Sequence, residues 1–433
     1  MASVAVLFFV LLGLVPAASA QAEEGVNINA NFIDETTDER TPATGTVLVL
    51  LDADGAEVAS TEIGDDGRAF LAAPGPGTYI VQLDEGTLPE GVRLRNEGAN
   101  ELEITLQAGQ IRGGIFALEQ GEGSGGGGSR FLSDLVSLSF SGLKFGLIIA
   151  MCSIGLSLIF GTTGLTNFAH GELVTVGALT TLFFNQSMHL VLAAIIGVAV
   201  TAAFGLMNER TIWRPLRDRG TGLIAMLVIS IGLSILVRYV LLYLAGGNRR
   251  AYNDFGNQSP IDFGPLTFVQ RDIFIMVIAL ISLVLVAFAV TYTRTGKAMR
   301  AVADNVDLAE SSGIDVQRVI QTVWIGGAGL AGLGGVLFGL DQTSKWDMGF
   351  ELLLLMFAAV TLGGLGTAYG PLIGSVLVGL LVNLSTITFP EWFPGIGGTG
   401  LPTELKNIGA LFVLVGILLI RPQGILGRAD RIG

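Results

Sequence analysis

The apolar positions of the chain fall into two patterns with different periods. Between residues 26 and 118, apolar and polar side chains alternate in short runs that Asp-Gly and Pro-Gly sequences separate, which is typical of strands and tight turns. From residue 138 onward, the apolar residues form continuous runs of about membrane length. The pattern predicts a multi-pass α-helical membrane protein with a small N-terminal all-β sandwich.

The alternating part is predicted to contain five strands. They cover residues 46–51, 57–63, 68–72, 78–83 and 101–106. Short strands at this spacing, separated by turn sequences, favour a β-sandwich. The order of strands and of their Asp-Gly and Pro-Gly turns over residues 43–95 resembles transthyretin-like or carboxypeptidase-regulatory-like extracellular modules, a resemblance that bears on fold far more than on function.

The apolar runs of the second part predict nine spans. They cover residues 138–161, 171–185, 188–208, 222–245, 272–292, 319–340, 351–366, 370–388 and 405–420. Two of these runs are short against the roughly 20 residues that a helical span needs, so we expect about eight or nine transmembrane helices. Many glycines crowd the run 319–340, which indicates a helix packed closely within a bundle.

The first residues have the form of a secretory signal peptide. An apolar run at 4–15 precedes Pro16 and the small residues 17–20, which predicts a signal at 1–20 that is cleaved after Ala20. An uncleaved anchor and a mis-chosen start are the alternatives, because the run is preceded by no Lys or Arg. The β-module at 21–120 is then extracytoplasmic. The Gly/Ser-rich segment 121–130 is predicted to be a flexible linker, and an engineered linker would have the same composition.

Composition excludes an ordinary cytosolic enzyme. The chain is 51% hydrophobic and 14% charged, against about 25% charged in typical soluble domains. The net charge of -13 divides unevenly: residues 21–124 hold 20 acidic and 5 basic side chains, and residues 125–433 hold 17 and 19. A single cysteine and two histidines argue against disulfides and zinc chemistry, so we expect no metal and no cofactor. The basic residues form only short clusters and no stripe, so we expect no nucleic-acid partner.

Basic residues indicate the orientation of the spans. They cluster after the third span, after the fifth span and at the end of the chain, namely Arg210, Arg214, Arg217, Arg219, Arg294, Lys297, Arg300, Arg318, Arg421, Arg428 and Arg431. The positive-inside rule places these clusters in the cytoplasm, as nine spans from an outside start require. Arg249, Arg250 and Arg271 are exceptions. The C-terminus is thus expected to be cytoplasmic, in a plasma (inner) membrane protein.

Three motifs interrupt or connect the apolar runs. The first, at 161–172, combines glycines with the polar residues Asn167, His170 and Glu172, and it predicts either a helix broken at membrane depth or a polar turn at the cytoplasmic surface. The third, at 362–374, again breaks an apolar run and contains Gly363, Gly364 and Gly366. Broken segments in separate halves of a chain indicate a translocation path.

The second motif, at 301–314, is predicted to be cytoplasmic. Val302, Val306 and Ala309 recur at helical spacing, and Gly313 stands where a helix would stop. A short amphipathic helix on a loop can lie in a groove of a soluble partner, although it can also be simply solvated.

Together with the ending at 421–427, the three motifs resemble the permease subunits of ABC importers for branched-chain amino acids, a family that includes urea and short-chain amide permeases. The resemblance covers residues 138–427, within a permease domain at 131–433, and residues 164–172 are its most specific part. It implies that a coupling segment contacts the ATPase through Asp304, Asn305, Val306, Ala309, Gly313 and Ile314. The N-terminal β-module is a departure from the family's minimal form.

The resemblance also implies partners: a second homologous permease, two cytoplasmic ATP-binding subunits and an extracytoplasmic solute-binding protein. No phosphate-binding loop occurs in the chain, so ATP hydrolysis is expected on the partner subunits and the permease itself is not an enzyme. The expected function is import of branched-chain or related hydrophobic amino acids. A urea or amide permease, a secondary transporter and a membrane-anchored receptor are the alternatives.

Overall fold

The computed structural model describes residues 25–33, 40–52, 55–94, 100–106, 111–120, 127–254, 261–263, 266–364 and 369–387, with isolated residues between 411 and 425. The chain divides into two compact units, Met1–Gly125 and Gly126–Gly433. The predicted signal peptide and most of the linker lie outside the described residues.

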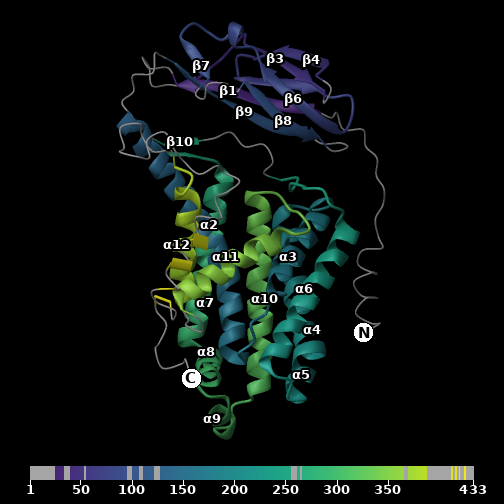
Figure 1. The fold of residues 1–433 in the computed structure, drawn as a ribbon, viewed down its shortest axis with the longest axis vertical. Helices are drawn as coiled ribbons and strands as arrows, with labels where there is room; N and C mark the ends of the chain where they lie inside the picture. The colour runs from purple at the N-terminus through teal and green to yellow at the C-terminus, as the bar shows by residue number, and fades with distance from the viewer. Residues whose placement is uncertain are drawn as a thin grey trace. The chain divides into compact units, whose positions relative to one another are not determined.

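Nine strands form the first unit. They are β1 (Gly25–Ile33), β2 (Arg40–Pro42), β3 (Val47–Leu51), β4 (Glu57–Glu62), β5 (Arg68–Ala72), β6 (Gly77–Leu83), β7 (Val92–Leu94), β8 (Glu101–Leu106) and β9 (Ile111–Gln120). One sheet has the order β4-β3-β6-β8, and the other has the order β2-β1-β9-β7, with β5 also paired to β1. Figure 1 shows these strands in the purple and blue part of the chain.

The two sheets enclose one apolar core, as a sandwich does. Every second residue of β1, from Val26 to Phe32, is buried, and so are Leu48 and Leu50 of β3 and Val81 of β6. The β-module and its five predicted strands are confirmed, with ends that shift by one residue at most. Four strands, β1, β2, β7 and β9, were not predicted individually.

Helices make up the second unit. They are α2 (Gly127–Thr163), α3 (His170–Asn185), α4 (Leu190–Asn208), α5 (Arg214–Asp218), α6 (Leu223–Ala245), α7 (Gln270–Tyr292), α8 (Arg294–Asp304), α9 (Val306–Ser311), α10 (Val316–Asp341), α11 (Met348–Gly363) and α12 (Gly370–Leu384). A π-helical turn, Glu209–Trp213, joins α4 to α5, and a hairpin of β10 (Ile261–Phe263) and β11 (Leu266–Phe268) precedes α7. Residues 127–130, which the sequence assigned to the linker, belong to α2.

Eight of the nine predicted spans correspond to a helix of this unit. Five described helices are long and apolar enough to cross a membrane: α2, α4 with α5, α6, α7 and α10. Helices α11 and α12 are apolar but shorter, and α3 has 16 residues. Of the predicted span 405–420, the structure describes residues 411, 412, 415, 416 and 419, which are helical. The chain is therefore a helical protein of membrane type with an N-terminal β-sheet unit.

Helices α2 and α10 form the centre of the bundle and lie side by side (Figure 1). In their most apolar stretches, 78% of α2 and 72% of α10 is buried inside the chain. Glycines permit the contact: a Cβ on Gly155 of α2 would lie 2.5 Å from the carbonyl oxygen of Gly327 in α10. The predicted burial of the glycine-rich helix is confirmed, because small residues allow such close approach of backbones.

Candidate translocation site

The first motif breaks the helical path between α2 and α3. Gly164 ends α2 in the left-handed region, with φ of +68°, and its N–H donates to the Phe160 carbonyl oxygen at 2.8 Å. The following residues are not helical until His170, where α3 begins. The side chain of Asn167 accepts a hydrogen bond from the Ala169 N–H at 3.0 Å and so stabilises the entry to α3.

The break lies deep within the bundle. His170 is fully buried, and its Nε2 lies 3.1 Å from the carbonyl oxygen of Cys152, so Nε2 carries the hydrogen. Cys152 precedes the end of α2 by 11 residues, which is roughly 16 Å of helix. The Phe168 N–H donates to Ser230 Oγ of α6 at 3.0 Å. The motif is therefore a buried break between two helices of the bundle, and its position relative to the membrane stays a prediction.

Glu172 is the charged residue of this region, and it lies in the first turn of α3. Its Oε1 accepts hydrogen bonds from Ser234 Oγ at 2.8 Å and from Arg238 Nε at 3.2 Å, both on α6. Arg238 also donates to Ser234 Oγ at 3.0 Å, and its guanidinium lies 3.7 Å from the ring centroid of Phe350 in α11. Sequence positions 172, 234 and 238 thus form one polar cluster, and Asp347, directly before α11, is near enough to act on Glu172 electrostatically.

Helix α11 begins beside the start of α3. Gly171 and Gly349 permit the contact, since a Cβ on Gly171 would lie 2.6 Å from the Gly349 carbonyl oxygen. The Gly349 N–H donates to Thr175 Oγ1 of α3 at 3.1 Å. Two short helices therefore start at the same place in the bundle. The N-termini of such interrupted helices carry partial positive charge toward the region between them.

A loop holds the end of α3 beside the start of α4. Tyr252 is buried, and its hydroxyl donates to the Ala178 carbonyl oxygen at 3.2 Å. Burial raises the pKa of Tyr252 above its ordinary value, which keeps the hydroxyl a donor. Asp254 accepts from the Leu190 N–H at 2.6 Å and from Asn185 Nδ2 at 2.9 Å. These contacts hold α3 in register with its neighbours.

The third motif does not join this site. Gly363 follows Gly349 by 14 residues, so it lies roughly 21 Å farther along α11. A Cβ on Gly363 would overlap the carbonyl group of Gly370 at the start of α12, and Gly364 has φ of +107°. Gly366 lies outside the described residues. These glycines permit a tight connection between α11 and α12 and are not beside Asn167, His170 or Glu172.

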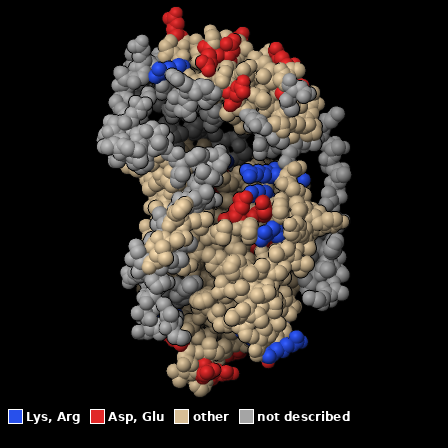
Figure 2. All heavy atoms as spheres, in the orientation of Figure 1, with Lys and Arg blue, Asp and Glu red and all other residues tan. Residues whose placement is uncertain are grey.

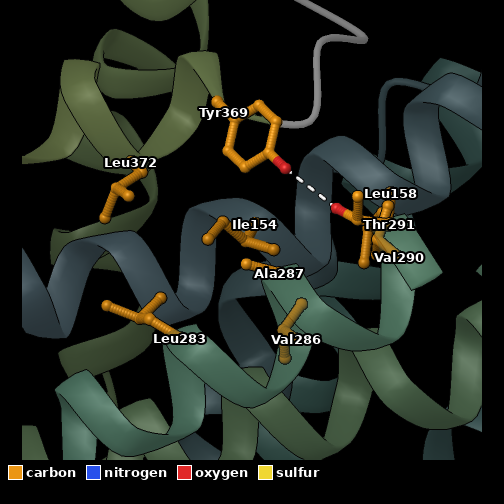
Figure 3. A pocket seen from close by; sticks show the side chains of 9 residues that line it. All are labelled: Ile154, Leu158, Leu283, Val286, Ala287, Val290, Thr291, Tyr369 and Leu372. Atoms are coloured by element: carbon orange, nitrogen blue, oxygen red, sulfur yellow. Dashed lines mark hydrogen bonds between the residues drawn. The ribbon is translucent and has the colours of Figure 1, made fainter.

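A small pocket lies near that connection (Figure 3). Nine residues line it: Ile154, Leu158, Leu283, Val286, Ala287, Val290, Thr291, Tyr369 and Leu372. The Tyr369 hydroxyl and Thr291 Oγ1, 2.8 Å apart, form a hydrogen bond at its edge. Its free volume of about 30 Å³ suits one or two water molecules and not an amino acid.

The predicted coupling segment forms two helices instead of one. Asn305 separates α8 from α9 in an extended conformation, and its side chain accepts from the Leu308 N–H at 2.9 Å as the cap of α9. Ala309 is buried against Val302 and Val319, and Ile314 packs on the same cluster. Val306 is 41% exposed and does not share this face, because the chain bends at Asn305.

The two ends of the segment follow the sequence more closely. Asp304 is the last residue of α8, and Gly313 has φ of +82°. The Ile314 N–H donates to the Ala309 carbonyl oxygen at 3.1 Å, which completes the helix stop that Gly313 predicted.

Three groups of charged residues in the bundle were missed from the sequence. Arg238 completes the cluster around Glu172. Lys144 of α2 contacts Asp272 at 2.8 Å and Asp341 at 2.5 Å. Glu209, fully buried in the π-helical turn, pairs with Arg217 and accepts from Gln317 Nε2 at 3.0 Å. The sequence did contain one indication of these groups: Arg238 and Lys144 are each a single charged residue within an apolar run, where a charge needs a partner.

Charged side chains are sparse elsewhere on the helical unit. On the face drawn in Figure 2 its surface is largely uncharged, with Lys, Arg, Asp and Glu gathered in limited groups. Among the described residues, no group of three or more His, Cys, Asp and Glu side chains could hold a metal ion. Cys152, a free thiol, is buried.

Comparison with known proteins gives a consistent result. The family model described as branched-chain amino acid transport system / permease component matches residues 138–418. The chain is 30% identical over 308 residues to the high-affinity branched-chain amino acid transport system permease protein LivH of Salmonella typhimurium, covering 67% of this chain and 95% of LivH. It is 28% identical to BraD of Pseudomonas aeruginosa, covering 69% of this chain and 97% of BraD.

A more distant relative, the permease protein LivM of Salmonella typhimurium, is 25% identical over 312 residues, which cover 65% of this chain and 68% of LivM. The match of the family model begins at residue 138, after the β-sheet unit. The similarity therefore concerns the helical unit.

Proposed function

Because the chain belongs to the family of branched-chain amino acid transport permeases, we propose that it forms part of the translocation path of an ABC importer for branched-chain or related hydrophobic amino acids. The match across 281 residues of the helical unit, together with coverage of 95% of LivH, carries this proposal. The broken entry to α3, with its buried polar residues inside the bundle, supports it physically, since such breaks occur where protein or a watery path satisfies the backbone.

The translocation path, in this proposal, passes the start of α3. Asn167 caps the entry to α3, and His170 bonds this entry to the Cys152 carbonyl oxygen of α2. Glu172 places a buried carboxylate beside the break. Gly363 contributes by allowing α11 and α12 to pack tightly, and Gly364 by its positive φ between them. Gly366 lies outside the described residues and stays a candidate from the sequence motif alone.

The membrane topology is proposed from the basic clusters. With eight or nine spans and an outside start, the β-module is extracytoplasmic, and α8, α9 and the C-terminus are cytoplasmic. The permease would then lie in the plasma membrane with its coupling segment on the ATP side.

The partners follow from the family and from the missing nucleotide site. ABC importers combine two permeases with ATP-binding subunits, and the more distant similarity to LivM is compatible with a homologous second permease. An extracytoplasmic binding protein would deliver the substrate. ATP hydrolysis belongs to the partners, so this chain needs no catalytic group.

The short helix α9 is the proposed contact with an ATP-binding subunit. Leu308 is 66% exposed and Val306 is 41% exposed, so an apolar surface is available although Ala309 is buried. An exposed apolar helix face can dock into a hydrophobic groove of a partner. Val306→Asp with Leu308→Asp is expected to abolish ATP-driven uptake, whereas Glu310→Ala on the same helix serves as the control.

One reconstitution experiment tests the function. The purified complex in proteoliposomes, loaded with ATP and supplied with the binding protein, is expected to accumulate leucine and to hydrolyse ATP faster in its presence. Stimulation by urea alone would contradict the amino-acid assignment. Leucine uptake without any co-purified ATP-binding subunit would contradict the ABC mechanism.

A further inference from the structure

The charged cluster around Arg238 lies where a membrane tolerates charge poorly. Arg238 precedes the end of α6 by seven residues, which is roughly 10 Å of helix, and Glu172 lies beside the break in α3. Ionisable residues at such depth face protein or water and mark binding or transport sites by default. Lipid is therefore not the neighbour of this cluster in the working complex.

The pair is incompletely bonded. Glu172 is 1% exposed, and its Oε1 takes both hydrogen bonds, while Oε2 has no partner among the described residues. Arg238 uses Nε and Nη2 in the hydrogen bonds described above, although a guanidinium has five N–H donors. Both partners thus retain bonding capacity, and a buried acceptor without a donor is costly.

The cluster that contains Lys144 provides the contrast. There one ammonium contacts two carboxylates, Asp272 and Asp341, and Asp272 also accepts the Val269 N–H at 3.1 Å. Within the described part of the chain, no polar atom of these three side chains is both buried and unpartnered. The pair on α3 and α6 therefore differs from this cluster in having a buried carboxylate oxygen, Glu172 Oε2, without a donor.

Apolar surface adjoins the pair on its accessible side. Arg238 lies over the ring of Phe350, which is 41% exposed, and Leu354, one turn farther along α11, is 50% exposed. The Arg238 side chain is 14% exposed. A ligand that reaches the guanidinium would therefore meet an aromatic ring and an aliphatic side chain at the same place.

We infer that Glu172, Ser234 and Arg238 form a site for the charged head group of a zwitterionic α-amino acid, with Phe350 and Leu354 contacting its apolar side chain. This inference rests on the proposed function. The ligand's ammonium group binds the Glu172 carboxylate, including the free Oε2, and its carboxylate binds the guanidinium of Arg238. One internal ion pair is exchanged for two with the ligand, so no charge is left unpaired at depth. Urea, which has no opposite charges, would not be held in this way.

The test uses the complete complex of both permeases and the ATP-binding subunits, without the binding protein. Radiolabelled leucine is displaced by leucine, by 3-methylbutylamine, which lacks the carboxylate, or by 4-methylpentanoate, which lacks the ammonium group. We expect the concentration that displaces half of the bound leucine to be at least about tenfold higher for each analogue than for leucine. Each analogue lacks one of the two charged groups and so loses one charge-assisted hydrogen-bonded pair. Equal displacement by either analogue would overturn the inference.

Matched variants locate the site. Glu172→Gln with Arg238→Gln removes both charges at once, so neither is stranded, and it should weaken leucine binding by at least about tenfold. Glu209→Gln with Arg217→Gln removes another buried ion pair, remote from the site along the chain, and should leave leucine binding unchanged. Wild-type affinity in the first variant overturns the inference.

Two further outcomes keep the test decisive. If the double variant does not assemble, Arg238→Lys decides, because lysine retains the charge but lacks the planar fork, and unchanged leucine binding would overturn the assignment. A wild-type complex that imports leucine but binds none at millimolar concentration overturns the site and leaves the proposed function intact. A complex that imports no leucine contradicts the function itself.

Discussion

Helices α6 and α7 each run for 23 residues, and the single chain leaves most of both uncovered: 17% and 22% of their most apolar stretches are buried. Their exposed surfaces differ in chemistry. Between Asp272 and Arg294, α7 and the residue after it contain no charged residue, whereas α6 carries Arg238 beside its exposed apolar residues. A surface with only apolar side chains can face lipid directly, but one with a guanidinium at depth needs protein or water beside it.

The two helices also lead to different parts of the proposed mechanism. Helix α6 supplies Ser234 and Arg238 to the cluster around Glu172. Helix α7 continues through Thr293 into α8, and Arg300 of α8 donates to the Val290 carbonyl oxygen at 3.0 Å. We interpret α6 as the helix that contacts the substrate and α7 as the lipid-facing helix that connects to the coupling segment.

The largest expected effect comes from leaving a charge of the α6 cluster unpaired. Arg238→Leu strands the Glu172 carboxylate, which is 1% exposed and would keep only Ser234 as a donor. Removing one partner of a buried ion pair costs about 3–5 kcal/mol of folding free energy. Denaturant unfolding of the purified permease should show that loss.

Its control adds Glu172→Gln to Arg238→Leu, which removes the second charge and should restore most of the lost stability. A stable Arg238→Leu single variant would mean that Glu172 is not held in a dry environment. Arg238 would then no longer distinguish the environment of α6 from that of α7.

The second effect introduces a charge on α7. Leu280 lies near the middle of the helix and is 56% exposed, so Leu280→Arg should place a guanidinium in the hydrocarbon core at a cost of about 2.5–3.5 kcal/mol. The amount of correctly inserted protein should fall, as protease protection in membranes can measure. Leu280→Ala is the matched control. Normal insertion of Leu280→Arg would indicate that this part of α7 borders protein or water.

A smaller effect is expected where α7 passes into the coupling segment. Thr293 caps α8, because its Oγ1 accepts from the Gly296 N–H at 3.0 Å. Thr293→Ala should cost about 1 kcal/mol locally and lower the uptake obtained per ATP hydrolysed. Thr211→Ala is the control, since that exposed hydroxyl in the π-helical turn donates to the Met207 carbonyl oxygen of α4 and caps no helix. If the two variants take up the same amount of substrate per ATP hydrolysed, the junction of α7 and α8 has no role in coupling.

How far the sequence predicted the fold depends on the residues of each element. The five named strands combine alternation with Asp-Gly or Pro-Gly turns, and the structure reproduces them. Strand β1 was missed because its polar positions are Asn27, Asn29 and Asn31, a residue type that strands disfavour. Strand β9 was missed because Gly113 and Gly114 indicate the end of a strand in sequence, whereas the strand continues through both glycines.

The candidate site was predicted only on one of its helices. Asn167, His170 and Glu172 lie within six residues, so a local motif was sufficient to find them. Arg238 follows Glu172 by 66 residues in the sequence and pairs with it only because α3 and α6 pack together. Similarly, the helical spacing of Val302, Val306 and Ala309 could not reveal the bend at Asn305, where the side chain caps a new helix.

The smallest expected effect tests the comparison most directly, because it asks what covers α7. Leu285 is 61% exposed, and if lipid covers it, Leu285→Ala exchanges one apolar contact for another and should change the unfolding free energy by less than about 0.5 kcal/mol. On α6, Leu241 is 4% exposed, so Leu241→Ala should open a cavity at a cost of about 2–5 kcal/mol. Measured in the assembled complex, a loss at Leu285 as large as that at Leu241 would mean that a protein subunit packs on α7. The lipid-facing role would then pass to another helix, and a protein subunit would contact the chain beside the coupling segment.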